Sequence, residues 1–146
     1  MSHSFFNPYA SFAQQPNSVR SHANAWIFYE LECFANDSLK QVVIVMTHFP
    51  HGAACVLDSS GRLIGLITDG DVRRALQAHD DIRDLNASAV MTANPSTIAP
   101  DASLQQALRL MEDRPSQISV LPVIDPGSGV CLGLLRLHDL YQSGRK

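Results

Sequence analysis

The sequence predicts an α/β (α+β) fold built from two copies of one small unit. Segment 38–46 aligns with segment 103–111 at an offset of 65 residues. In both segments apolar residues recur at i, i+3, i+4 and i+7, which places them on one face of an amphipathic helix. Each helix is followed by two apolar runs separated by a turn, the pattern of a β-hairpin. Such an internal repeat determines the architecture before any single motif does.

The first copy is predicted from its N-cap onward. Ser38 is a natural N-cap for the long helix that follows it. Apolar runs 53–57 and 63–67 form the hairpin, and a short closing helix over 70–77 begins directly after it. A strand over 26–32 is expected before the long helix, but its polar–apolar alternation is poor. The predicted unit is therefore β-α-β-β-α with an irregular start.

The second copy repeats this order. Ser103 precedes its long helix, and apolar runs 118–124 and 130–135 form its hairpin. The closing helix is expected over 137–141, and a short strand over 96–98 precedes the long helix. The turn of this hairpin is slightly longer than that of the first, and turns are where insertions are expected.

The chain divides into three predicted parts. Residues 1–24 mix Ser, Asn, Gln, His and Pro with isolated aromatics and lack a sustained period, which indicates a mobile N-terminal arm. Docking of those aromatics on a neighbouring surface is the alternative interpretation. The first repeat is placed at 25–84 and the second at 85–146. Between the copies, the linker 78–94 carries charged residues interpreted as a solvated face.

Length and charge exclude several classes of protein. A chain of 146 residues has the usual length of one compact domain. Its net charge is −3 and no basic run is longer than Arg73-Arg74, so nucleic acid is not an expected partner. No apolar run approaches the roughly 20 residues that a membrane helix needs, so no membrane association is expected.

The cysteines indicate a compartment. Cys33, Cys55 and Cys131 lie far apart, are odd in number and form no CxxC motif, which favours free thiols in a reducing compartment. The N-terminus lacks the charged and apolar regions of a secretory signal. We therefore expect a cytoplasmic protein, in which Cys55 and Cys131 are small hydrophobic core residues.

Several segments resemble the CBS-domain family, and the resemblance covers about residues 30 to 143. The matching segments are Val90-Met91-Thr92, Asn94-Pro95, Leu121-Pro122-Val123-Ile124-Asp125 and Gly65-Leu66-Ile67-Thr68-Asp69-Gly70-Asp71-Val72-Arg73-Arg74. Within the family, segments 68–76 and 135–140 resemble the C-terminal regulatory half of arabinose-5-phosphate isomerases, enzymes of Kdo biosynthesis.

This resemblance implies two β-α-β-β-α CBS repeats with pseudo-twofold symmetry, and mixed sheets with helices. It also implies a homodimer and two clefts between the repeats where adenosine or other nucleotides bind. In the isomerases a catalytic sugar-isomerase domain precedes the CBS pair, and residues 1–37 are too short to contain one. We therefore expect no catalytic residues and no enzyme activity.

Residue chemistry points to the first cleft independently. Thr68 ends a strand and Asp71 lies in the first turn of the next helix, whose free N–H groups and dipole favour a phosphate. The Asp71 carboxylate can accept hydrogen bonds from both ribose hydroxyls, and Thr68 can donate one to a phosphate oxygen. Arg73 and Arg74 can add charge-assisted bonds. The alternative is that Thr-x-x-Asp is a capping box and binds nothing.

The second cleft departs from the family's pattern. Asp139 is retained, but Arg136 replaces the hydroxyl residue, which suits a more acidic ligand such as a sugar nucleotide with a carboxylate, or a surface arginine without a ligand. His138 precedes Asp139 and either leans into this cleft or packs elsewhere. Thr97, in the short strand before the second long helix, completes the set of candidate ligand-binding residues.

The leading hypothesis is a non-catalytic regulatory module that binds a nucleotide or sugar nucleotide and controls a sugar-phosphate isomerase. AMP and ATP are candidate ligands, and no obligatory cofactor is expected. The alternatives are a structural dimerisation module without a ligand and the regulatory part of a sugar nucleotidyltransferase. No metal site is expected, because the closest histidine pair, His48 and His51, spans a predicted helix end.

Overall fold

The structure, a computed structural model, describes residues 18–19, 32–48, 52–113 and 118–137. The described elements are β1 (Glu32–Phe34), α1 (Leu39–His48), β2 (Ala53–Leu57), β3 (Leu63–Thr68), α2 (Asp69–Ala78), α3 (Ala87–Val90), β4 (Thr92–Ala93), α4 (Leu104–Glu112), β5 (Val120–Ile124) and β6 (Cys131–Arg136). The predicted α+β class and the two repeats are confirmed. The predicted closing helix over 137–141 lies outside the described residues beyond Leu137.

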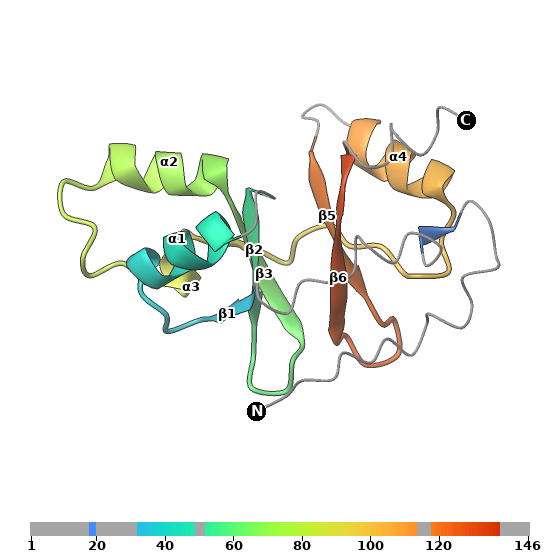
Figure 1. The fold of residues 1–146 in the computed structure, drawn as a ribbon, viewed down its shortest axis with the longest axis horizontal. Helices are drawn as coiled ribbons and strands as arrows, with labels where there is room; N and C mark the ends of the chain where they lie inside the picture. The colour runs from blue at the N-terminus through green and yellow to red at the C-terminus, as the bar shows by residue number, and fades with distance from the viewer. Residues whose placement is uncertain (1–17, 20–31, 49–51, 114–117, 138–146) are drawn as a thin grey trace.

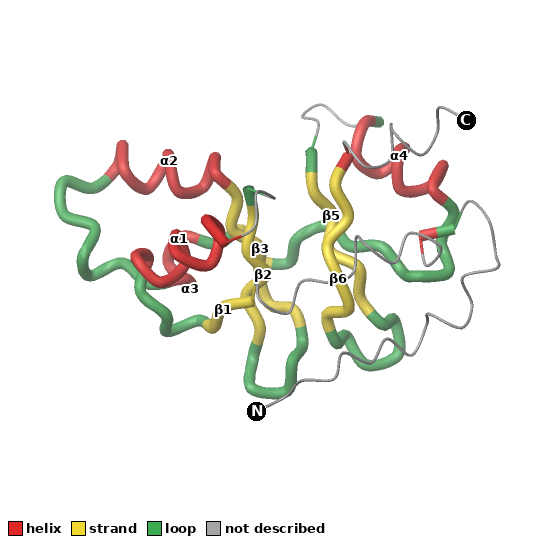
Figure 2. Tube along the Cα trace, viewed as in Figure 1, coloured by secondary structure: helices red, strands yellow, loops and turns green. Residues whose placement is uncertain are grey.

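Two sheets carry the fold (Figure 2). In the first, the order is β1-β2-β3-β4: β1 runs parallel to β2, whereas β2 with β3 and β3 with β4 are antiparallel. The second sheet is the antiparallel hairpin β5-β6. Both predicted hairpins are thus present, with strand ends that lie within two residues of the prediction.

The sheets face each other in the middle of the molecule, with α1, α2 and α3 outside the first sheet and α4 outside the second (Figure 1). A buried cluster fills the space between the two hairpins, with Cys55 and Leu66 on one side and Val120 and Leu134 on the other. One further buried cluster lies under the helices of the first half, and another lies under α4 in the second half. Burial of apolar side chains between the layers stabilises this arrangement.

Both long helices begin where the N-cap residues predict. The backbone N–H of Gln41 donates to Ser38 Oγ at 3.1 Å, and that of Gln106 donates to Ser103 Oγ at 3.0 Å. At the second helix, Gln106 Oε1 also accepts from the Ser103 backbone N–H at 2.9 Å, which completes a capping box. Local sequence therefore sets these helix starts.

The strands predicted before the two long helices are described only in part or are reduced to a single bridge. β1 begins at Glu32, the last residue of the strand predicted over 26–32, whose other residues are not described. The strand predicted over 96–98 is a single parallel bridge between Ile98 and Val123. Both segments hold their place by pairing with a buried hairpin strand, which local alternation does not reveal.

The predicted linker 78–94 contains α3 and β4, which is a correction to the sequence analysis. β4 pairs with β3 through Gly65 and Ala93. Gly65 allows this close approach, because a side chain there would collide with Met91. The charged residues near the start of the linker are exposed, as predicted.

Of the arm predicted over residues 1–24, the structure describes Ser18 and Val19. Val19 is fully buried in the core beside α4, and its backbone N–H donates to Ala102 O at 2.9 Å. In the first half, the backbone N–H of Ala87 donates to Asp37 O at 2.8 Å in the same way. Val19, which precedes the first half in sequence, therefore completes the second half. Ala87, which precedes α4 of the second half, completes the first half. The arm's aromatics lie outside the described residues.

Candidate functional site

A cleft of about 220 Å³ opens at the N-terminus of α2, between the two halves. It is lined by Leu66, Thr68, Asp71, Arg74, Thr92, Pro95, Ser96, Ile118 and Val120. Thr68, Asp71 and Arg74 of the first half supply most of the polar groups, whereas Ile118 and Val120 of the second half supply an apolar wall. Such a concave site, apolar with a few convergent polar groups, is typical of small-molecule binding.

Thr68 and Asp71 form the capping box of α2. Thr68 is the N-cap with extended backbone, and its Oγ1 accepts from the Asp71 backbone N–H at 3.4 Å. In return, Asp71 Oδ2 accepts from the Thr68 backbone N–H at 2.9 Å and from Thr68 Oγ1 at 3.1 Å. The capping box predicted from Thr-x-x-Asp is therefore present, and Thr68 and Asp71 also line the cleft.

The second carboxylate oxygen of Asp71 has two other donors. Arg74 Nη2 donates to Asp71 Oδ1 at 2.6 Å, and Thr92 Oγ1 donates to the same oxygen at 3.3 Å. The Asp71 side chain is buried, whereas the Arg74 side chain is 70% exposed. A buried carboxylate is thus paired with a cation whose side chain is largely exposed to solvent.

The structure brings together only some of the predicted binding residues. Thr68, Asp71 and Arg74 line the cleft. Arg73 is exposed on α2 and Thr97 is half-buried, and neither lines it.

At the corresponding place in the second half, Arg136 ends β6 opposite Val120, as Thr68 ends β3 opposite Ala53. This places Arg136 at the position equivalent to Thr68, as the sequence comparison of the two copies predicts. His138 and Asp139 lie outside the described residues, so the second cleft stays a prediction.

Several residues that line the cleft were not predicted from the sequence to bind a ligand. Thr92 and Pro95 belong to segments that carry the family resemblance, and Ser96 lies in the predicted strand 96–98, so a signal was present for these three. Ile118 and Val120 had none, because they reach the cleft only through packing of the second hairpin against the first.

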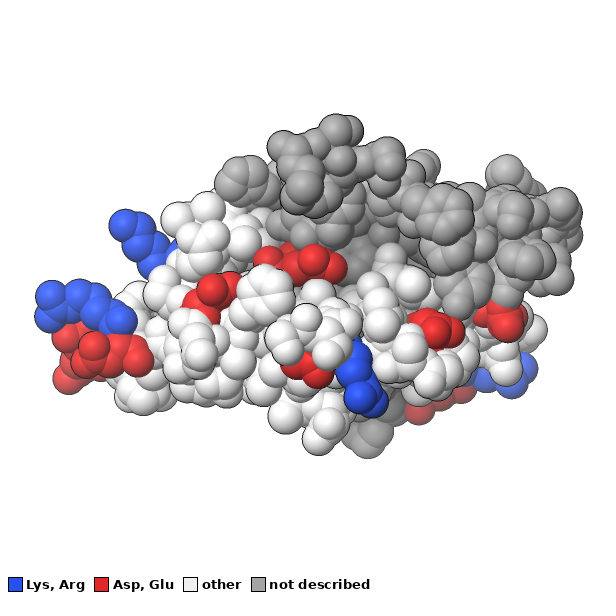
Figure 3. All heavy atoms as spheres, turned by 90° about the horizontal axis from the view of Figure 1, so that it is seen from below, with Lys and Arg blue, Asp and Glu red and all other residues white. Residues whose placement is uncertain are grey.

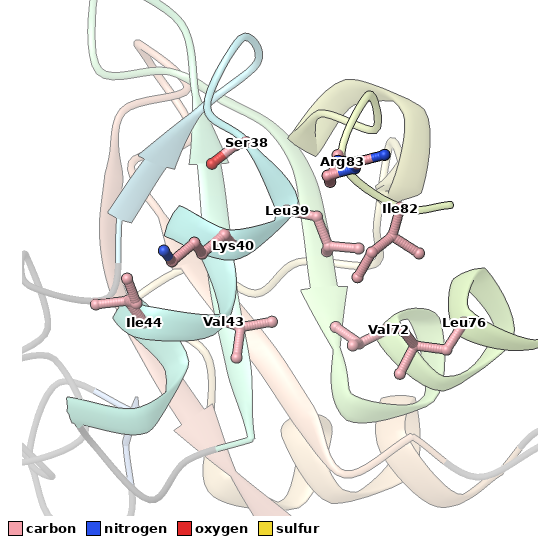
Figure 4. Close-up of a pocket in the computed structure, with 9 residues that line it drawn as sticks. All are labelled: Ser38, Leu39, Lys40, Val43, Ile44, Val72, Leu76, Ile82 and Arg83. Atoms are coloured by element: carbon pink, nitrogen blue, oxygen red, sulfur yellow. The ribbon is translucent and has the colours of Figure 1, made fainter. Parts of the chain in front are cut away.

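A second concavity is an apolar groove of about 640 Å³ on the outer face of the first half (Figure 4). It is lined by Ser38, Leu39, Lys40, Val43, Ile44, Val72, Leu76, Ile82 and Arg83. Figure 4 shows Val43 of α1 and Leu76 of α2 reaching into the space between the two helices. Leu76 is 53% exposed, and Val43 and Ile44 in the same groove are also exposed. A contiguous exposed apolar patch of this kind is unusual on a protein surface.

The buried groups whose pKa values are shifted lie outside the cleft. Burial raises the pKa of Glu32 to about 7. Burial, with a smaller effect from the Asp37 carboxylate, raises the pKa of Cys33 to about 12. A hydrogen bond to Cys131, together with burial, holds the pKa of Cys55 well above its usual value. Glu32, Cys33 and Cys55 do not line the cleft at Asp71.

Charges and helices within the described ranges add little to these sites. Figure 3 shows acidic and basic side chains dispersed over one face, without a continuous basic surface. Among the described residues, no three side chains of the His, Cys, Asp or Glu type come together as a metal site. In the same ranges, no helix has the length and apolar character needed to span a membrane.

The family model of the CBS domain matches residues 31–78 and 83–144. The chain belongs to the CBS-domain family. The solved CBS-pair protein CBSX2 of Arabidopsis thaliana matches with a TM-score of 0.68 at 16% identity, covering 87% of this chain and 93% of that one. A CBS-domain protein of Bacillus anthracis matches with a TM-score of 0.69 at 18% identity over 90% and 94% of the two chains. A further CBSX2 structure, described as a complex with AMP, matches with a TM-score of 0.65 at 17% identity over 76% of this chain and 85% of that one. These likenesses concern the fold.

Curated relatives of this CBS pair include longer proteins. Arabinose 5-phosphate isomerase KdsD of Pseudomonas aeruginosa is 37% identical over 107 residues, which are 73% of this chain and 32% of the relative. An uncharacterized protein of Rickettsia prowazekii is 33% identical over 135 residues, 92% of this chain and 39% of the relative. The chain therefore spans roughly a third of the length of these relatives.

Proposed function

We propose that this CBS pair is a non-catalytic regulatory module that binds a nucleotide or sugar nucleotide in the cleft at Asp71. One observation carries the proposal: a buried carboxylate lines a cleft between two halves, and its cationic partner Arg74 is largely exposed. A buried charge is costly unless it is paired, so Asp71 needs either Arg74 or a ligand that replaces it.

The proposed binding step exchanges hydrogen bonds. Ribose hydroxyls donate to Asp71 Oδ1 and displace Arg74, whose guanidinium turns toward the ligand's phosphate. The N–H groups at the start of α2 face the same phosphate. The apolar wall of Leu66, Ile118 and Val120 offers a surface for a base. Because the wall belongs to both halves, occupancy favours one arrangement of the halves over another.

Similarity supports the identity of the regulated process. The isomerase KdsD of Pseudomonas aeruginosa is similar to this chain over 107 residues, and a CBS pair of the same fold has been solved as a complex with AMP. We propose that the module acts in the cytoplasm on a sugar-phosphate isomerase of the arabinose-5-phosphate type, in Kdo biosynthesis. It works without an obligatory cofactor.

The test is a thermal-shift screen of AMP, ADP, ATP, CMP, S-adenosylmethionine and CMP-Kdo against the wild type and Asp71→Ala. A ligand at a hundredfold excess over its Kd stabilises by about 2.7 kcal/mol, so the melting temperature rises. The rise is expected to vanish in Asp71→Ala. The matched control is Asp84→Ala, which removes an exposed carboxylate of the linker and keeps the rise.

A second candidate function is a dimerisation module that binds no ligand. The groove between α1 and α2 favours this function. In a twofold dimer, this exposed apolar groove would pack against the same groove of the second copy. If no compound shifts the wild type, while Asp71→Ala lowers its melting temperature through loss of the capping box, this candidate replaces the first. Both functions are compatible with a homodimer.

A further inference from the structure

Ser18 and Val19 are held at the start of α4, in the second half of the molecule. The Val19 backbone N–H donates to Ala102 O at 2.9 Å, and Ser18 pairs with Ser103 in an antiparallel bridge. Val19 is fully buried and Ser18 is 6% exposed, so both residues belong to the core. Because protein cores are closely packed, a displacement of residues 102 and 103 disturbs the packing of Val19.

The segment 95–103 connects this contact to the candidate cleft. Pro95 and Ser96, at its beginning, line the cleft. In its middle, both backbone groups of Ile98 are hydrogen-bonded to β5, each at 3.0 Å. The rings of Pro95 and Pro100 fix two of its φ angles. A segment this short and this restricted transmits a displacement at one end to the other end.

Side chains provide a second connection. Ile118 lines the cleft and packs against the buried cluster that contains Val19 and Ile98. Val120 lines the cleft from β5, the strand to which Ile98 is bonded. The apolar wall of the cleft and the segment 95–103 therefore belong to the same packed unit as Val19.

We infer that the contact of Ser18 and Val19 with the second half responds to occupancy of the cleft, an inference that rests on the proposed function. A nucleotide that contacts the segment 95–103 and the apolar wall restricts the unit that holds Val19, and so stabilises this contact. Val19 in place keeps the same wall in the arrangement that the ligand needs, so binding requires less ordering. By linkage, each event changes the equilibrium of the other by the same factor.

The first measurement follows the valine amides of the full, isotope-labelled chain by NMR during a titration with AMP. The Val19 resonance should move along the binding curve obtained by calorimetry. Val42 is the reference, because it is also fully buried but lies in the core cluster under α1, and its resonance should stay in place. If AMP binds and the Val19 resonance does not move, the coupling is refuted while the proposed function stands.

The second measurement compares the Kd for AMP in Val19→Ala and Val42→Ala. Both substitutions remove the same methyl groups from fully buried sites. Val19→Ala should raise the Kd at least about fivefold, the lower end of typical coupling between two sites, whereas Val42→Ala should leave it unchanged. Circular dichroism checks that both variants fold, and the wild-type titration decides the matter if Val19→Ala does not. An unchanged Kd in folded Val19→Ala would contradict the coupling.

A third measurement needs no ligand. Thr92→Phe places a ring in the cleft from the first half, whereas Ala93→Phe places one at the next exposed position of β4, which does not line the cleft. Without nucleotide, Thr92→Phe should move the Val19 resonance and Ala93→Phe should not. If AMP does not bind but Thr92→Phe moves Val19, the proposed function fails and the coupling stands. If Thr92→Phe leaves Val19 in place as well, the coupling is overturned.

Discussion

The Asp71 carboxylate accepts hydrogen bonds from Thr68, Arg74 and Thr92, and each bond must be kept or exchanged when a ligand binds. The Thr-x-x-Asp pattern predicts the bonds within α2, because they depend on a spacing of three residues. It does not predict Thr92, which lies 21 positions away and reaches Asp71 through the pairing of β4 with β3. The sequence therefore predicts the contact between Thr68 and Asp71, whereas the contact between Thr92 and Asp71 depends on the fold.

Glu32 gives a prediction at the same scale. Burial raises its pKa from 4.5 to about 7, so between these values the folded chain holds a proton that the unfolded chain releases. The free energy of unfolding should therefore fall as the pH rises from 4.5 to 7, and the loss should be complete above 7. Partial exposure of the side chain reduces the expected loss to about 1–2 kcal/mol.

Denaturant unfolding from pH 4.5 to 8 measures this effect. Glu32→Gln should lose that part of the pH dependence, whereas Asp84→Asn, at an exposed site, should keep it. Equal slopes for the wild type and Glu32→Gln across this range would show that Glu32 ionises as freely in the folded chain as in the unfolded one.

Helices and strands differ in how much of them the sequence predicts. The starts of α1 and α4 follow from Ser38 and Ser103, because an N-cap and an apolar period act within a few residues. The bounds of β1 and the existence of β4 depend on pairing with β2 and β3, which no local pattern contains. The hairpins were predictable since their strands are adjacent in sequence and joined by recognisable turns.

A prediction at the element scale concerns the cap of α4. Ser103→Ala removes the acceptor for the Gln106 backbone N–H and should lower the free energy of unfolding by about 1 kcal/mol. Gln105→Ala, at an exposed position of the same helix, should leave stability nearly unchanged. Chemical denaturation of the three proteins makes the comparison, and similar midpoints for the two variants would contradict a capping role.

At the scale of the whole molecule, the groove between α1 and α2 predicts self-association. Leu76→Glu places a charge among the apolar residues of the groove and should convert a dimer into a monomer, measured by light scattering after size-exclusion chromatography. Leu110→Glu is the matched control, because Leu110 is an exposed leucine on α4, away from this groove. A monomeric wild type, or dissociation by the control alone, would contradict this interface.

The contact of Val19 with the second half has a consequence for biosynthesis. Val19 is synthesised 83 residues before Ala102, whose carbonyl receives its N–H. At about 5–20 residues per second, Val19 precedes its complete core by on the order of ten seconds. α3, in contrast, is made shortly after the half that it completes. The first half can therefore close while translation continues, whereas the second half must recruit a segment that was made before the first half.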